Sequence, residues 1–152
     1  MSAAVEYSTN KATAAQIAAH LSDGDADFVP PLSSRIEIRS YANKICNNAV
    51  RFEAWSGGML IGLVAAYCND NEARIAYITS VSVLKKWTGK GIAASLLKQC
   101  VAHANASGMR LIRLEVSGNN TPAIRLYEKM GFVADRSYQP SGSRHFCLAI
   151  GE

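Results

Sequence analysis

The chain contains 152 residues, with a formal net charge of +4 and a sequence pI near 9.0. Its 49% hydrophobic and 18% charged residues exclude a disordered chain and favour one globular domain over residues 1–152. Because the charge is mild and few aromatic residues lie between the scattered basic ones, we expect no nucleic-acid partner.

The N-terminal residues and the cysteines bear on where the protein works. Residues 1–10 lack the pattern of a signal peptide, and the longest apolar run, residues 59–68, is too short to cross a bilayer. The four cysteines form no C-x-x-C pair, and the three histidines lack metal-ligand spacing. We therefore predict a cytoplasmic protein with reduced, buried cysteines, no metal and no membrane partner, either a monomer or a homodimer.

The first third of the chain predicts a short strand and two helices. Residues 5–8 form the strand, and residues 13–21 form a helix capped by its first threonine. Paired prolines then exclude a helix, after which Ser33 or Ser34 is expected to cap a second helix that ends near residue 46.

Alternating apolar residues predict strands in the middle of the chain. Residues 50–55 and 59–68 are separated by a Ser-Gly-Gly turn and predict a β-hairpin. Residues 73–84 predict a third antiparallel strand.

Helices and strands alternate in the last third, which predicts parallel crossovers. A helix is expected from residue 92 to the Ser-Gly pair at 107–108, followed by a strand over 109–117. A second helix, capped by one of residues 119–121, ends at 130 and leads into a strand over 132–137. After a loop over 138–142, a last strand over 144–150 closes the sheet. The fold class is therefore α/β (mixed α+β), a central twisted mixed sheet of about six or seven strands flanked by about four helices.

The stretch from Val81 to Ala93 carries the strongest functional signal. It reads VSVLKKWTGKGIA, an apolar strand that enters a basic, glycine-containing turn and then a helix. The glycines at 89 and 91 allow a close approach of the backbone, and the start of the helix offers free N–H groups and the positive end of its dipole. This stretch predicts a site for a phosphate-bearing molecule.

Three nucleotide-like ligands compete for this turn. The P-loop pattern G-x-x-x-x-G-K-[ST] is absent, which disfavours an NTPase. Residues 89–94 match the dinucleotide pattern G-x-G-x-x-A, with Glu115 downstream, but that fold places its first glycine directly after the strand. Here residues 84–88 intervene, and the remaining chain is too short for a second half. The third ligand is coenzyme A, whose pyrophosphate the turn can hold.

An ordered set of motifs supports coenzyme A as the ligand of this turn. The set consists of Lys86-x-x-Gly89-x-Gly91-Ile92-Ala93 after a Val-x-Val strand, Leu114-Glu115-Val116, Asn120-x-x-Ala123 and the run LYEKMGF over residues 126–132. Over about residues 77–133 it resembles the GNAT superfamily of acyl-CoA-dependent N-acetyltransferases. One position departs from the pattern, because Lys86 stands where Gln or Arg is usual.

The resemblance implies a cofactor, a mechanism and a set of site residues. Acetyl-CoA is the implied acyl donor, held by Val81, Ser82, Val83, Lys86, Thr88, Gly89, Lys90, Gly91, Ile92, Ala93 and Asn120. The implied reaction is direct attack of a primary amine on the thioester, without a covalent enzyme intermediate and without a metal.

The resemblance also implies roles in the chemistry. Tyr127 is the implied general acid for the departing thiolate, and a backbone N–H near Val83 the oxyanion donor. Glu115 is the implied general base, although strand alternation places it beside Arg113 and allows a simple ion pair instead. Asn120 either holds the cofactor arm or caps its helix.

The acceptor is less defined. The resemblance implies that the first two helices and the loop over residues 138–143 select it, leaving a small amine, an amino sugar or a peptide N-terminus open. Acids at 23, 25, 27 and 37 could attract a cationic amine or be solvated loop charges. A non-catalytic acyl-CoA-binding module is the alternative function, and a dinucleotide-binding protein is a weaker one.

Overall fold

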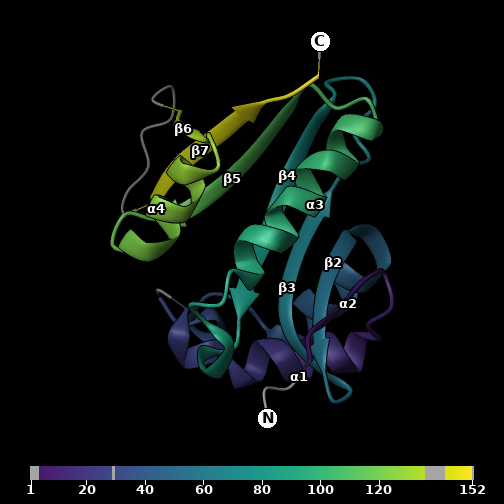
Figure 1. Ribbon diagram of the computed structural model, residues 1–152, viewed down its shortest axis with the longest axis vertical. Coiled ribbons are helices and arrows are strands. Elements are labelled where there is room, and N and C mark those ends of the chain that lie inside the picture. The colour runs from purple at the N-terminus through teal and green to yellow at the C-terminus, as the bar shows by residue number, and fades with distance from the viewer. Residues whose placement is uncertain (1–3, 29, 136–142, 152) are drawn as a thin grey trace.

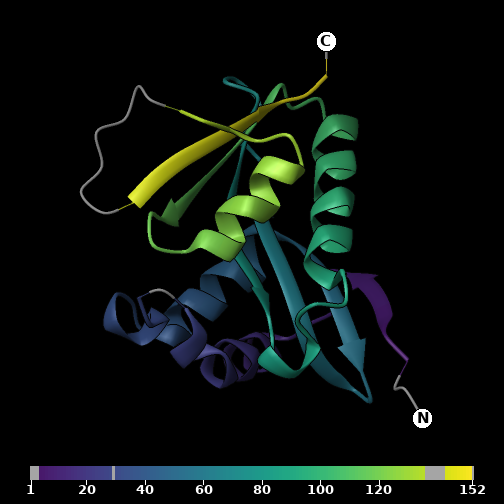
Figure 2. The same ribbon diagram turned by 60° about the vertical axis from the view of Figure 1, so that its left-hand side comes forward.

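A computed structural model describes residues 4–28, 30–135 and 143–151. The described strands form one seven-stranded sheet in the order β1-β2-β3-β4-β5-β7-β6. The strands are β1 Glu6–Thr9, β2 Val50–Ser56, β3 Met59–Tyr67, β4 Ile75–Val83, β5 Leu111–Ser117, β6 Val133–Ala134 and β7 Ser143–Ala149. The α-helices are α1 Ala14–Asp23, α2 Ile38–Asn48, α3 Ile92–Ala106 and α4 Thr121–Lys129, and α3 and α4 lie on the opposite face of the sheet from α1 and α2 (Figures 1 and 2). The predicted fold class is confirmed.

The two N-terminal helices begin at different kinds of cap. Thr13 caps α1 as predicted, in a capping box with Gln16. The predicted serine cap of α2 is wrong, because Ser33 and Ser34 lie in a separate 3₁₀ turn, Leu32–Ser34. The carboxylate of Glu37 caps α2 instead, accepting the backbone N–H of Arg39 at 2.6 Å. Glu37 therefore has a structural partner.

The first four strands are antiparallel, and β4-α3-β5 forms the predicted parallel crossover. The position predicted for the last strand is wrong: β7 does not close the sheet but lies between β5 and β6. The reason is the number of backbone pairs, because β7 pairs with β5 along all of Leu111–Ser117, whereas β6 has only two residues. One edge of the sheet is therefore the short strand β6, and the other is β1.

The parallel strands β4 and β5 separate part-way along their length. Their pairing ends at Ile78 and Leu114, although β4 continues to Val83 and β5 to Ser117. Figure 1 shows the two strands diverging toward α1. Beyond Ile78, the edge of β4 that faces β5 has no ladder partner among the described residues. Its backbone groups are therefore available to a ligand.

A β-bulge lies where the strands begin to separate. Along β3, Ala65 pairs with Ser80 but Ala66 pairs with Ile78, which leaves Thr79 as an extra residue in β4. The hydroxyl of Tyr41, on α2, donates to the Thr79 carbonyl at 2.5 Å. The bulge reverses the alternation of β4, so that Ser82 faces α1.

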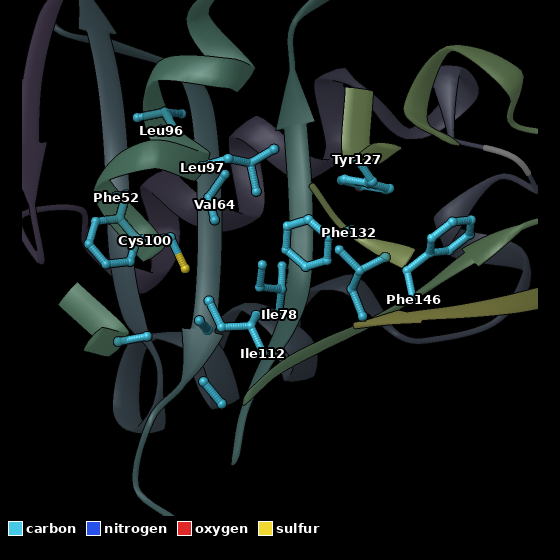
Figure 3. Close-up of a cluster of buried hydrophobic side chains, with 14 of the residues drawn as sticks. Phe52, Val64, Ile78, Leu96, Leu97, Cys100, Ile112, Tyr127, Phe132 and Phe146 are labelled. Carbon is cyan, nitrogen blue, oxygen red and sulfur yellow. The ribbon is translucent and has the colours of Figure 1, made fainter. Parts of the chain in front are cut away.

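Two hydrophobic cores lie on opposite faces of the sheet. One, between the sheet and α3 and α4, contains Phe52, Leu96, Ile112 and Phe146, and Figure 3 shows its central side chains. The smaller core packs α1 and α2 against β3. Both faces of β3 are therefore buried, which explains why its sequence is apolar without alternation.

A buried carboxylate fixes the start of α1. Glu53 is fully buried and accepts the backbone N–H groups of Lys11 and Ala12 at 3.0 and 2.9 Å. It also accepts the Ser8 hydroxyl at 2.9 Å and Trp55 Nε1 at 3.4 Å. Its charged partner is Arg51, with Nε at 3.4 Å and an exposed side-chain fraction of 8%. The pair connects β2 to the segment that leads into α1.

Glu53→Gln is expected to lower the free energy of unfolding by about 3 kcal/mol, because it leaves the buried Arg51 charge without a counterion. Urea unfolding would measure the loss. Glu72→Gln, at an exposed turn, is the control and is expected to change stability by less than about 0.5 kcal/mol. Equal losses in the two variants would contradict a special role for the buried pair.

Candidate functional site

A cavity of about 490 Å³ lies where β4 separates from β5. Its lining comes from four parts of the chain: α1 and the turn after it, the end of β4, the glycine turn with the start of α3, and α4. The residues are His20, Gly24, Asp27, Phe28, Val81, Ser82, Val83, Leu84, Lys85, Trp87, Thr88, Gly89, Gly91, Ile92, Ala93, Ala94, Asn120, Pro122, Ala123 and Leu126. Because α1 and α4 lie on opposite faces of the sheet, the cavity reaches both faces at the gap.

The glycine turn has the backbone shape that an anion site needs. Gly89 and Gly91 have φ of 78° and 80°, in the left-handed region that favours glycine. Gly91 is the N-cap of α3 and has no side chain to satisfy the first helical N–H groups. Ile92, Ala93 and Ala94 follow it and line the cavity. Their amides and the helix dipole therefore favour an anion there.

Two amides of the turn have other acceptors. The N–H of Trp87 donates to the Leu84 carbonyl at 2.8 Å, and that of Thr88 to the Lys85 carbonyl at 3.3 Å. These two N–H groups are therefore engaged within the 3₁₀ turn Lys85–Trp87 and the residue after it, which leaves the start of α3 as the main source of donors at the cavity.

The predicted cofactor-binding residues divide into two groups. Residues 81–83, Thr88, Gly89, residues 91–93 and Asn120 line the cavity. Lys86 and Lys90 are exposed and lie outside the lining, whereas Lys85 is part of it. The lysine that lines the cavity at the turn is therefore Lys85, not the predicted Lys86 or Lys90.

Asn120 has the capping role that the sequence allowed. Its Oδ1 accepts the backbone N–H of Ala123 at 3.3 Å and caps α4. The residue also lines the cavity.

Tyr127 lies next to the cavity but is not part of its lining. It is 6% exposed in the core under α4, and its ring lies 5.9 Å from that of Phe132 (Figure 3). Burial raises the pKa of Tyr127 to about 12. Ala123, one helical turn earlier, does line the cavity, so Tyr127 stands directly behind the wall.

Glu115 lies on the other face of β5. Its neighbours Leu114 and Val116 enter the core below α4, whereas Glu115 is exposed and accepts the Ser143 hydroxyl at 2.5 Å. It does not line the cavity. The structure therefore separates the two predicted catalytic residues, with Tyr127 in the core and Glu115 on the open face.

His20 is a polar residue of the cavity that sequence reasoning missed. It is 3% exposed, and its ring nitrogens contact two acceptors or donors: Nδ1 lies 2.9 Å from the Leu60 carbonyl oxygen and Nε2 lies 2.7 Å from Ser82 Oγ. Burial lowers the pKa of His20, against the opposing effects of the Leu60 carbonyl and of Asp23. The sequence around His20 did not indicate a site residue, because its partners Leu60 and Ser82 lie 40 and 62 positions away along the chain.

The depressed pKa of His20 predicts a stability that falls in acid. The unfolded chain protonates this imidazole at a higher pH than the folded chain does, so the unfolded state binds more protons. The stabilisation is complete above the ordinary histidine pKa and is lost as the pH falls through the lowered value. Urea unfolding at pH 7.5 and 5.5 should show a smaller drop for His20→Gln than for the wild type. An equal drop would contradict the assignment.

The other predicted features concern cysteines, metals and membranes. Cys46, Cys68, Cys100 and Cys147 are free thiols, and burial raises the pKa of Cys100 to about 12. Among the described residues, no group of three or more His, Cys, Asp or Glu side chains could hold a metal ion. Within the same residues, no helix has the length and apolar character needed to cross a membrane.

Comparison with a family model gives a match over most of this site. The model described as the acetyltransferase (GNAT) family matches residues 20–132. The match begins at the cavity residue His20 and includes the glycine turn, Glu115 and Tyr127.

Curated relatives match a shorter part of the chain. Mycothiol acetyltransferase from Corynebacterium glutamicum (strain R) is 30% identical over 84 residues, which cover 55% of this chain and 28% of the relative. N-alpha-acetyltransferase MAK3 from Arabidopsis thaliana is 30% identical over 89 residues, or 57% of this chain and 47% of the relative. The chain thus spans less than half the length of these relatives.

A solved structure matches nearly the whole chain. The ribosomal-protein-S18-alanine N-acetyltransferase from Escherichia coli superposes with a TM-score of 0.74 at 20% identity, covering 98% of this chain and 96% of that one. At this identity the likeness is one of fold.

Proposed function

Because this chain belongs to the GNAT family of acetyltransferases, we propose that it transfers an acetyl group from acetyl-CoA to a primary amine by direct attack, without a covalent enzyme intermediate. The main support for this proposal is the cavity that connects the glycine turn to the gap between β4 and β5. It offers an anion site at one end and an unpaired strand edge along its side.

The proposed donor site uses both features. The amides from Gly89 to Ala94 suit the pyrophosphate, with Lys85 as a nearby cation. The edge of β4 at Val81–Val83 suits the amide groups of the pantetheine arm, because an extended ligand can pair with an open strand edge. A backbone N–H near Val83 is the proposed donor to the oxyanion.

The proposed chemistry needs a proton donor for the leaving thiolate. Tyr127 fits this role because, with a pKa of about 12, its phenol stays protonated at neutral pH. Glu115 stays a prediction for the base that takes the proton of the amine. In support of this role, Glu115 is exposed and directly follows Leu114, the last residue of β5 that pairs with β4.

The acceptor is proposed to enter from the side of α1. Asp27 and Phe28 line the cavity there, so a carboxylate and an aromatic ring both face an incoming cationic amine. Asp25 is less available, because its carboxylate accepts the Ser33 hydroxyl at 2.6 Å. Two relatives are named a mycothiol acetyltransferase and an N-alpha-acetyltransferase, and the acceptor class proposed here is a small amine, an amino sugar or a peptide N-terminus.

The test is release of coenzyme A from acetyl-CoA in the presence of spermine, glucosamine or a peptide that begins with alanine. Chromatography should quantify the product, because thiol reagents would also react with the four cysteines of the protein. Turnover with at least one amine is expected. Acetyl-CoA binding by calorimetry without turnover on a broad amine panel would instead indicate a non-catalytic acyl-CoA-binding module.

A further inference from the structure

Hydrogen bonding fixes which nitrogen of His20 carries a proton. The Leu60 carbonyl can only accept a hydrogen bond, so Nδ1 of His20 must donate to it. In the neutral ring, Nε2 then has a lone pair, and the hydroxyl of Ser82 donates to it across 2.7 Å. The imidazole is thus held as a proton acceptor whose partner is a hydroxyl that lines the cavity.

The bulge at Thr79 places this pair on one side of β4. Val81 and Val83 pack with the core of α3 and α4, whereas Ser82 points to α1 and His20. The glycine turn and α3 lie on the valine side, where the donor is proposed to bind. The hydroxyl of Ser82 therefore faces the part of the cavity that remains for the acceptor.

We propose that Ser82 and His20 take the proton from the acceptor amine. As the C–N bond forms, the attacking nitrogen gives a proton to Ser82 Oγ, and the proton of that hydroxyl passes to Nε2 of His20. The C–S bond then breaks, and the thiolate takes a proton from Tyr127. Solvent then restores both groups: it takes one proton from His20 and returns one proton to Tyr127. Ser82 is the catalytic residue and His20 acts through it.

The surroundings of His20 allow it to cycle between its two charge states. Asp23 on the same helix and the Leu60 carbonyl favour the imidazolium, whereas burial opposes it. Asp27 and Lys85 are the charged residues that line the same cavity. Leu60 and Ser82 are its contacts from the sheet. The neutral ring is the resting state, since burial lowers the pKa of His20.

This inference rests on the proposed function, and the experiment separates the two. Turnover of acetyl-CoA with spermine and with the alanine peptide should be compared for the wild type, Ser82→Ala, His20→Gln and their double variant. Each single variant is expected to lower kcat about 100-fold while leaving the Kd for acetyl-CoA within about twofold, because general base catalysis is lost but the donor site is not. The double variant should lose no more than either single one, since the two residues act as a unit.

Two controls address folding and the competing base. Ser80→Ala removes a hydroxyl from the same strand outside the cavity lining, and it should keep wild-type kinetics. Glu115→Gln tests the other candidate base. A large loss in Glu115→Gln together with wild-type turnover in Ser82→Ala would assign the proton to Glu115.

Nitrogen NMR of histidine-labelled protein tests the pair without an acceptor. His20 is expected as the neutral tautomer with Nδ1 protonated, and its Nε2 resonance should shift in Ser82→Ala. A protonated Nε2 at neutral pH would overturn the proposal, as would a Ser82→Ala variant that changes only the Kd for acetyl-CoA. No turnover by the wild type would instead contradict the proposed function itself.

Discussion

Gly91→Asp is expected to weaken acetyl-CoA binding at least about 100-fold. A carboxylate about 4 Å from a phosphate charge is repelled by about 4 kcal/mol at the effective dielectric of a protein surface. Salt and solvent screening reduce this value, which is why the expected loss is smaller than the full repulsion. Calorimetry with acetyl-CoA at low ionic strength would measure it.

The substitution should leave the fold intact. A Cβ at Gly91 would meet nothing within 4 Å, and aspartate and asparagine tolerate the left-handed backbone that this residue adopts at φ 80°. Gly91→Asn is therefore the matched control, with the same shape and no charge, and should lose roughly tenfold or less, since charge-assisted bonds to the phosphate are kept. The difference in acetyl-CoA affinity between Gly91→Asp and Gly91→Asn should decrease in 0.5 M salt, where the Debye length is only a few Å. Equal affinity of the two variants would place the phosphates elsewhere.

Local patterns in the sequence predicted the parts of the site that are formed by neighbours along the chain. The capping threonine of α1, the glycine turn and the asparagine cap of α4 each depend on residues within a few positions of one another. Hydrogen bonds and backbone conformations within a few residues determine these features, and they agree with the structure.

Features that depend on distant partners were not predicted. The bond between His20 and Ser82 joins residues 62 positions apart, and the insertion of β7 beside β5 depends on which strands offer the longest ladder. The bulge did leave a local trace, because the inward residues Ile78 and Val81 are three positions apart where an unbroken strand would space them by two. If this spacing had been interpreted as a switch of side chains from one face of the sheet to the other, it would have predicted that Ser82 points toward the first helix.

Tyr127→Phe is expected to lower kcat about 100-fold, within the range for loss of a general acid, and to leave the Kd for acetyl-CoA unchanged. The ring keeps its packing beside Phe132, so the loss isolates the phenolic hydroxyl. Tyr7→Phe, at an exposed position on β1, is the control for removing a tyrosine hydroxyl and should have wild-type kcat.

The raised pKa of Tyr127 sets the pH dependence expected for this loss, and the split between kcat and the Kd for acetyl-CoA distinguishes a proton donor from a packing residue. With a pKa of about 12, the Tyr127 phenol is protonated throughout pH 6–9, so Phe should reduce kcat by the same factor at every pH in that range. Any curvature of the pH profile that the titration of His20 or of the acceptor amine causes should persist in Tyr127→Phe, because the substitution removes neither group. A wild-type kcat would remove Tyr127 from the mechanism. A loss confined to acetyl-CoA affinity would mean that the hydroxyl only supports the cavity wall behind Ala123, and that the thiolate leaves with a proton from solvent.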